Sequence, residues 1–345
     1  MKILRIYTKL PPYGGGMEKH IKELTLRQIE HGNEVSIFFN KGDSVSEKDV
    51  RIPKFPLGDF KPQFIGVFIF YFFIIFHLIL TRKKYHVLHI HGDWSSVFFS
   101  KIIKNCINAK KVIFSIHDDF NNNFSRIFFK KKLRHIDIFF STGYNSFQFL
   151  KKTNKPNTFF QPSGVSSLFF ADCGINIMNK NIDVISIGNL VSKKNLDLVL
   201  NIAKSLPNNS FVIVGEGNQR RHLSSRIKNE KIYNLELIGH KTQQQVKNLL
   251  CMSRLFLHTA KIEGTPTSIM EAMAVGLPII STNAGGIKKV IGSDNFLFEE
   301  KEEFVEAIKK LLADNELYKE ISSLNKLKAK DFSWDKVFNS INSKF

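Results

Sequence analysis

The sequence predicts an α/β protein made of two doubly wound, Rossmann-like domains, with a helix at the C-terminus. Its 345 residues exceed what one hydrophobic core usually organises, since single cores stop growing near about 250–300 residues. Short β-branched or apolar runs alternate with longer amphipathic runs, which is typical of βαβ units and a parallel sheet. A composition of 43% hydrophobic and 23% charged residues excludes a disordered or fibrous chain.

The first series of elements occupies residues 1–165, the expected N-terminal domain. Its strands are expected at 2–7, 34–39, 86–91, 111–117 and 136–142. Its helices are expected at 17–30, 64–80, 94–105 and 124–134. The stretch at 166–181 has weak periodicity and polar breaks, and we therefore place the interdomain linker there.

The second series occupies residues 182–330, the expected C-terminal domain, and a tail at 331–345 follows it. Its strands are expected at 182–188, 211–215, 235–239, 254–259 and 278–282. Its helices are expected at 193–204, 219–228, 242–250, 266–275 and 302–313. The tail is amphipathic and is expected to form a C-terminal helix that packs back on the first domain.

The run at 64–80, FIGVFIFYFFIIFHLIL, is almost wholly apolar and is followed by Arg82, Lys83 and Lys84. Seventeen residues of helix measure about 25 Å, short of a bilayer core of about 30 Å. A span would also put neighbouring strands of one sheet on opposite sides of the membrane. Two interpretations remain: a buried core helix, or a helix that lies in the membrane interface.

The net charge of +19 is uneven: residues 1–165 carry +14 and residues 166–345 carry +5. A basic half indicates an anionic partner, which could be nucleic acid, an anionic membrane or a phosphorylated substrate. A lysine-rich composition without a function is the plain alternative. Three distant cysteines (Cys106, Cys173 and Cys251) are expected to form no disulfide framework, and with no secretory signal evident we expect a cytoplasmic protein.

Two loops at strand ends have the character of phosphate sites. Gly14-Gly15-Gly16 follows the first strand and leads into a helix, where glycines and unpaired N–H groups can approach a phosphate. Asn189 and the pair Lys193-Lys194 follow the first strand of the second domain, and a lysine there can neutralise phosphate oxygens. A structural turn and a solvated lysine pair are the alternatives.

The most informative segment is Glu263-Gly264-Thr265-Pro266-Thr267-Ser268-Ile269-Met270-Glu271, after an apolar strand. Pro266 favours the first turn of a helix, with Thr265 expected as its N-cap. Glu263 would then stand at the mouth of the loop and Glu271 inside the helix. Two carboxylates placed in this way can hold the hydroxyl groups of a sugar and of a ribose, with free N–H groups between them.

The segment EGTPTSIMEAMAVGLPIISTNAGG resembles the signature of the retaining glycosyltransferases of family four, which have the GT-B fold. GGMEKHI, HVLHIHGDW, FSIHDD, FVIVGEGN and LELIGH are similar to other family segments and come in the family's order. The resemblance covers nearly the whole chain and is weakest over 40–85 and 145–180.

The resemblance implies that the two domains face a cleft, with residues 1–165 as the acceptor-side domain and residues 182–330 as the nucleotide-sugar-binding domain. It also implies a role for each matching residue. His117, Glu263 and Lys194 would be catalytic: His117 near the donor sugar and acceptor, Glu263 on the transferred sugar, Lys194 on the diphosphate. The implied donor-binding residues are Gly15, Gly16, Asn189, Lys193, Lys194, Gly215, His240, Gly264, Thr265, Thr267, Ser268 and Glu271. Asn189 stands where the family usually has Arg, so either Lys193 compensates or the diphosphate binds more weakly.

The histidines at other strand ends are interpreted as structural (His89, His91, His240 and His258), although His240 could also flank the nucleotide base through its backbone. Asp118 and Asp119 are adjacent rather than spaced as a metal pair, so no metal and no cofactor beyond the UDP- or GDP-linked donor are expected.

The resemblance implies retaining transfer of a hexose to a glycan or lipid-linked acceptor, in surface polysaccharide or lipopolysaccharide synthesis. We expect a cytoplasmic enzyme, peripheral on the inner face of the plasma membrane and without nucleic-acid partners. The alternatives are a basic protein that binds nucleic acid or membrane without catalysis, and a sugar-nucleotide epimerase of related fold.

Overall fold

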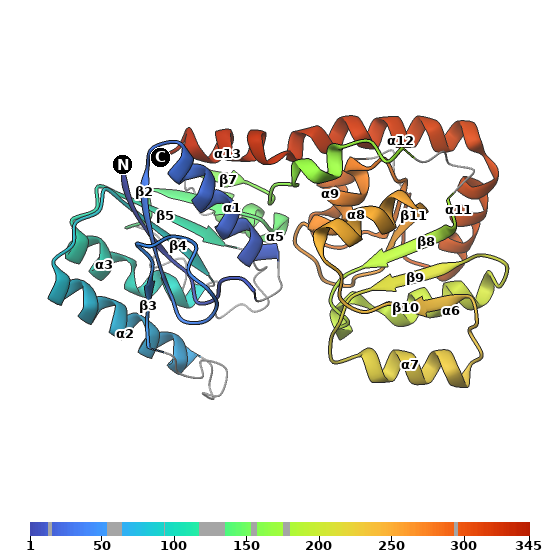
Figure 1. Ribbon diagram of the computed structural model, residues 1–345, viewed down its shortest axis with the longest axis horizontal. Helices are drawn as coiled ribbons and strands as arrows, with labels where there is room; N and C mark the ends of the chain where they lie inside the picture. Colours follow the sequence, from blue (N-terminus) through green and yellow to red (C-terminus); the bar gives the residue numbers. More distant parts are fainter. Residues whose placement is uncertain are drawn as a thin grey trace. The chain divides into compact units, whose positions relative to one another are not determined.

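The computed structural model describes residues 1–12, 16–53, 64–92, 94–116, 135–152, 157–174, 180–292 and 296–345. The chain divides into two compact units, of which the first comprises Met1–Ser163 with Val337–Phe345 and the second comprises Gly164–Lys336. Each unit is built on one parallel sheet with helices packed against it (Figure 1). The predicted α/β architecture of two doubly wound domains is therefore confirmed.

The first sheet has the strand order β3-β2-β1-β4-β5-β6-β7, and its neighbouring strands pair in parallel. The strands are β1 (Lys2–Ile6), β2 (Glu34–Phe39), β3 (Val50–Arg51), β4 (Val87–Gly92), β5 (Lys111–Ile116), β6 (Ile138–Ser141) and β7 (Thr158–Phe160). The helices described in this unit are α1 (Gly16–Glu30), α2 (Phe64–Thr81), η1 (Trp94–Phe99), α3 (Ser100–Ile107) and α5 (Tyr144–Lys151).

The two faces of the first sheet are covered differently. On one face, Phe70 and Ile74 of α2 and Ile103 of α3 are fully buried in the main apolar cluster. On the other, Arg5 of β1 is fully buried and donates a hydrogen bond to Gln28 of α1 at 2.6 Å. Burial lowers the pKa of Arg5 to about 9, although the Asp49 carboxylate opposes the shift. The polar partners on α1 therefore fix how this helix sits on the sheet.

The C-terminal helix α13 (Trp334–Asn342) carries the chain back to the first unit. The ring of Phe338 lies 4.6 Å from that of His31, and Lys111 Nζ donates a hydrogen bond to the Lys344 carbonyl at 2.9 Å. Val337, Phe338 and Ile341 are buried. The last residues are therefore part of the folding unit that the first residues begin.

The second sheet has the order β10-β9-β8-β11-β12-β13, also with parallel neighbours. Its strands are β8 (Ile182–Ile187), β9 (Phe211–Val214), β10 (Leu235–Leu237), β11 (Ser253–His258), β12 (Ile279–Thr282) and β13 (Phe296–Phe298). Its helices are η3 (Ser167–Phe170), η5 (Ser192–Lys194), α6 (Leu196–Ser205), α7 (Arg220–Asn229), α8 (Gln243–Cys251), α9 (Thr267–Ala274), α10 (Ile287–Ile291), α11 (Lys301–Ala313), α12 (Asn315–Ala329) and η6 (Lys330–Phe332).

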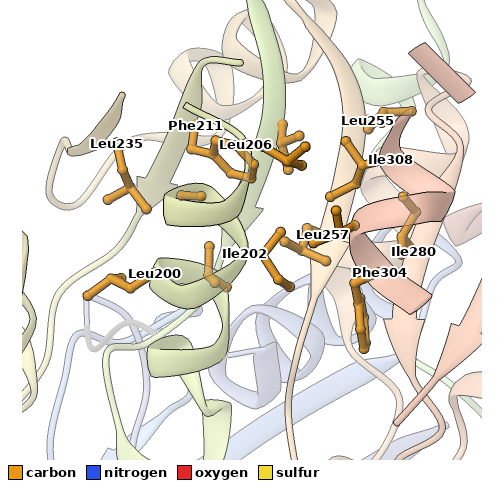
Figure 2. Close-up of a cluster of buried hydrophobic side chains, with 14 of the residues drawn as sticks. Leu200, Ile202, Leu206, Phe211, Leu235, Leu255, Leu257, Ile280, Phe304 and Ile308 are labelled. Carbon is orange, nitrogen blue, oxygen red and sulfur yellow. The ribbon is translucent and has the colours of Figure 1, made fainter. Parts of the chain in front are cut away.

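Alternate side chains of the second sheet enter two separate apolar clusters. Leu255 and Leu257 of β11 pack with α6 and α11, and Figure 2 shows Ile202 and Phe304 of these helices in the same cluster. Phe256, which lies between them in the strand, packs with α8 and α9 on the opposite face. Successive side chains of β11 point to opposite faces of the sheet, and both faces are buried, as is typical of a parallel sheet.

Several elements differ from those expected. The helix expected at 193–204 is divided into η5 and α6, because Asn195 adopts a left-handed conformation with φ of 50°. The helix expected at 94–105 is likewise divided into η1 and α3. Helices α5 and α12 and the short edge strands β3, β7 and β13 are not evident in the sequence pattern. The helix expected at 124–134 lies outside the described residues.

The apolar run at 64–80 forms α2, and within the described residues no helix has the length and hydropathy needed to cross a membrane. One face of α2 is core, as the fully buried Phe70, Ile74 and Leu78 show. The other face is open, since Phe72 and Leu80 are 64% and 66% exposed, so α2 is a core helix on one face only.

The expectation that the cysteines form no disulfide framework did not anticipate a single disulfide. Cys173 and Cys251 form a disulfide within the second unit, with their Cα atoms 5.4 Å apart. The two residues are 78 positions apart, and the fold brings the segment after η3 against the end of α8. The cysteine pattern therefore no longer supports the expected cytoplasmic location, which remains a prediction.

Candidate functional site

The second unit has its topological switch point between β8 and β11. From this neighbouring pair the strand order runs outward through β9 and β10 on one side and through β12 and β13 on the other. All these strands are parallel, so the loops at their carboxyl ends lie at one edge of the sheet. Ligands of open α/β sheets bind at this position, and the loops after β8 and β11 contain the predicted Lys194 and Glu263.

Hydrogen bonds join these two loops through their backbones. Lys261 N–H donates to the Lys193 carbonyl at 2.9 Å. Thr259 Oγ1, of the residue after β11, donates to the carbonyls of Lys194 and Asn195 at 3.0 and 3.1 Å. The lysine pair is therefore held at a fixed position against the loop that carries Glu263.

Lys194 and Glu263 form an ion pair across the switch point through Nζ and Oε2. Their side chains are only 14% and 15% exposed. Nε2 of His258, the last residue of β11, lies 3.4 Å from the same carboxylate oxygen. The structure thus brings together two of the predicted catalytic residues and adds a histidine whose expected role was structural.

This environment determines the charge of each group. Burial acts to raise the pKa of the Glu263 carboxyl, but His258 and the Lys194 ammonium outweigh it and lower the pKa to about 2. Burial lowers the pKa of His258, despite the neighbouring carboxylate. At neutral pH the site therefore contains an ionised Glu263 and a neutral His258. Such a carboxylate can accept hydrogen bonds from hydroxyl groups but cannot donate a proton.

Helix α9 places the rest of the acidic segment. It begins at Thr267 with Pro266 as its N-cap, so the expectation of Thr265 as N-cap is wrong. Glu271 lies four residues after Thr267 and three after Ser268, which places it beside both on the helix surface, and all three are partly exposed. Ile269 and the following Met270 are fully buried. The free N–H groups of the first turn of α9 therefore lie at the end of the helix that the loop from Gly264 enters.

Two glycines let the strand-end loops approach one another closely. A Cβ on Gly285, which has φ of +57°, would lie 1.7 Å from the Glu263 carbonyl oxygen. A Cβ on Gly215, which has φ of +145°, would lie 2.0 Å from the Gly188 carbonyl oxygen. Both positions require glycine for packing. Gly215 thus has a structural role at the β8–β9 edge, and its predicted contact with the donor remains a prediction.

The other predicted residues of the second unit lie at the same sheet edge. Asn189 and Lys193 are exposed in the loop after β8, and His240 is exposed after β10. Gly264 is partly exposed, and its carbonyl accepts a hydrogen bond from Gly286 N–H at 2.9 Å. The side chain of Asn189 carries no charge, so the positive charge of this loop comes from Lys193 and Lys194.

The first unit has its own switch point, between β1 and β4. Gly16 begins α1, whereas Gly15 and His117 lie outside the described residues. Buried polar side chains gather near this strand edge: Tyr7 Oη donates to Glu18 Oε1 at 3.4 Å, and His20 Nδ1 lies 3.2 Å from Ser163 Oγ.

The sequence pattern assigns no functional role to His258 or to this buried group around Glu18 and His20. His258 could have been found from its position, because it ends the strand that precedes the acidic segment. Glu18 and His20 stand in the GGMEKHI segment, one helical turn beyond the glycines. Their burial, 8% and 3% exposed, depends on how α1 packs on the sheet, which the sequence pattern does not reveal.

Comparison with protein families agrees with this architecture. The model for Glycosyltransferase Family 4 matches residues 14–148, and the model for Glycosyl transferases group 1 matches residues 174–327. Together the two models span most of the chain, one in each unit.

Individual proteins are more distantly similar. A human phosphatidylinositol N-acetylglucosaminyltransferase subunit is 24% identical over 301 residues, which are 81% of this chain and 61% of the human protein. Sucrose-phosphate synthase from Thermosynechococcus elongatus has a TM-score of 0.83 at 15% identity, covering 99% of this chain and 98% of the synthase. HepE from Anabaena, solved in complex with UDP, has a TM-score of 0.80 at 14% identity, covering 100% of this chain and 99% of HepE.

The low pKa of Glu263 predicts a pH-dependent stability. A carboxyl whose pKa falls on folding stabilises the folded state above its unfolded pKa, and this stabilisation is lost as the pH falls towards the folded value. A shift from 4.5 to about 2 corresponds to about 3 kcal/mol at neutral pH. We expect Glu263→Gln to lower the free energy of unfolding in urea, by a margin that shrinks by about 1 kcal/mol between pH 6 and pH 3.5.

The control is Glu320→Gln, which removes an exposed carboxylate from α12. A difference between Glu263→Gln and the parent protein that stays constant from pH 6 to pH 3.5 would contradict the assignment of an ionised, buried Glu263.

Proposed function

Because the chain belongs to the group 1, family-4-like glycosyltransferases of GT-B fold, we propose that it moves a sugar from a nucleoside diphosphate sugar to a hydroxyl group of a glycan or lipid-linked acceptor. The observation that supports this most directly is the Lys194–Glu263 ion pair at the switch point of the second unit. The donor would bind there, and its diphosphate and sugar would each replace one partner of the pair.

Lys194 would stabilise the leaving diphosphate. Negative charge develops on the diphosphate as the glycosidic bond breaks, and a fixed ammonium nearby lowers the energy of that state. Its backbone is held by Thr259, so little reorganisation is needed. The first N–H groups of α9 would bind phosphate oxygens in addition.

Glu263 and Glu271 would hold hydroxyl groups. The ionised Glu263 accepts hydrogen bonds from the transferred sugar, and Glu271, on the outward face of α9, accepts them from the ribose. Glu263 is not proposed as a general acid, since its pKa is lowered to about 2. His117 remains our candidate for a contact with the donor sugar and acceptor. Retention of anomeric configuration and independence of metal ions also remain parts of the proposal.

The proposed acceptor is a lipid-linked hydroxyl group. The name of the human relative describes transfer of N-acetylglucosamine to phosphatidylinositol, and this chain spans less than two thirds of that relative's length. A lipopolysaccharide or surface-polysaccharide acceptor, as expected from the sequence, shares the chemistry of a hydroxyl group on a lipid-anchored glycan. The relatives support a hydroxyl group on a lipid-linked molecule as the acceptor, and they do not favour phosphatidylinositol over a lipid-anchored glycan.

The test is to incubate the purified protein with UDP-, GDP-, ADP- and dTDP-linked sugars and a membrane lipid extract, with and without EDTA. We expect one donor to release its nucleoside diphosphate faster than the others, at a rate that EDTA does not change. A product analysed by NMR should keep the anomeric configuration of the donor. Failure of every donor in the presence of extract would count against the proposed activity.

The proposed ribose contact predicts the effect of Glu271→Ala. Loss of a charged acceptor should weaken binding of the preferred nucleoside diphosphate by about 1.5–3 kcal/mol, measured by calorimetry. Glu320→Ala, which removes an exposed carboxylate of α12, is the control. Equal affinities of Glu271→Ala and the parent protein would exclude this role for Glu271.

A further inference from the structure

One face of α2 is exposed and entirely apolar. Of its side chains, Phe72 is 64% exposed, Phe76 53%, Ile79 57% and Leu80 66%. Ile65 and Phe68 extend the same face towards the start of the helix. Exposed apolar residues are common singly, but a continuous group of this kind marks an interaction site.

The spacing shows that these side chains form one stripe. Positions 65, 68, 72, 76 and 79 are three or four residues apart, which places them on one side of a helix, and with position 80 they occupy an arc of roughly 120°. A surface helix of a soluble protein has polar residues in this position. Ile102, 50% exposed, belongs to α3, the helix that lies beside α2 in Figure 1.

The opposite face anchors α2 in the first unit. Phe70, Ile74 and Leu78 are fully buried, and the ring of Tyr71 stacks on that of Phe99 of η1 at 4.6 Å. The helix therefore stays on the surface with its axis fixed, and its exposed stripe is presented outward.

Positive charge borders the stripe. Arg82, Lys83 and Lys84 directly follow α2 and are exposed, and exposed Lys101 precedes Ile102 on α3. The segment 64–84 contains no acidic residue. An apolar stripe bordered by cations complements a surface with anionic groups outside and hydrocarbon beneath them, which is the structure of an anionic bilayer.

We propose that the outward face of α2, with Ile102 and the basic segment Arg82–Lys84, is a membrane-docking surface that inserts into the headgroup region of anionic bilayers. The apolar side chains of the stripe are buried among the lipid chains, and the basic segment attracts the anionic headgroups. The helix lies in the interface and does not span the bilayer. This property is independent of sugar transfer, so a failure of the proposed activity would leave it standing.

The test is co-sedimentation of the full chain with vesicles of phosphatidylcholine alone or mixed with phosphatidylglycerol. We expect binding to the mixed vesicles to exceed binding to the neutral ones at 0.1 M salt. Binding should fall at 0.5 M salt, where the Debye length drops from about 10 Å to below about 5 Å. The triple variant Phe72→Gln, Phe76→Gln and Leu80→Gln should bind at least about tenfold more weakly.

Matched variants separate the surface from general effects. Leu327→Gln on α12 removes a leucine that is 64% exposed, against 66% for Leu80, and should bind vesicles like the parent protein. Arg82→Gln, Lys83→Gln and Lys84→Gln together should weaken binding. A control variant replaces three exposed basic residues on or beside α7 with Gln, namely Arg221, Lys228 and Lys231. This control should weaken vesicle binding far less. Circular dichroism checks that each variant is folded.

Three results would overturn the proposal. The first is equal, negligible binding of the parent protein to both kinds of vesicle. The second is vesicle binding that the α2 triple variant, when folded, retains in full. The third is a parent protein that forms a dimer in light scattering, loses the dimer in the triple variant and binds no vesicles, because the stripe would then join two copies of the chain.

Discussion

The candidate site of the second unit depends on one buried ion pair, between Lys194 and Glu263. Charged groups that are about one seventh exposed lose most of their hydration, and their mutual attraction offsets part of that cost. The pair joins the loops after β8 and β11, at the place where the strand order reverses. Packing around it, at Thr259 and Gly285, fixes the same two loops.

The pair also explains how one site can serve a ligand with a charged part and a neutral part. A diphosphate offers Lys194 a partner of the same sign as Glu263, and sugar hydroxyls can donate to the carboxylate that is released. Lys194 and Glu263 are already largely removed from water in the folded protein. Ligand binding therefore replaces the partner of each group within a preorganised environment. His258, which burial keeps neutral, adds no competing charge to this exchange.

The sequence was sufficient to predict most strands and the residues at their carboxyl ends, because parallel strands buried on both faces form short apolar runs. It was not sufficient for properties that depend on which elements are neighbours. The approach of His258 to Glu263 and the Cys173–Cys251 disulfide both follow from the packing of the fold. The apolar run of α2 likewise has one buried and one exposed face, which an all-apolar segment cannot indicate by its pattern.

The most direct test of the site is the kinetic effect of Lys194→Ala. If the ammonium stabilises charge that appears as the bond breaks, kcat should fall at least about a hundredfold, while the donor dissociation constant rises less than about tenfold. Titration calorimetry measures the dissociation constant independently of turnover. A variant with unchanged kcat and only a raised KM would show that Lys194 binds the donor uniformly, and would contradict the central role of the ion pair in catalysis.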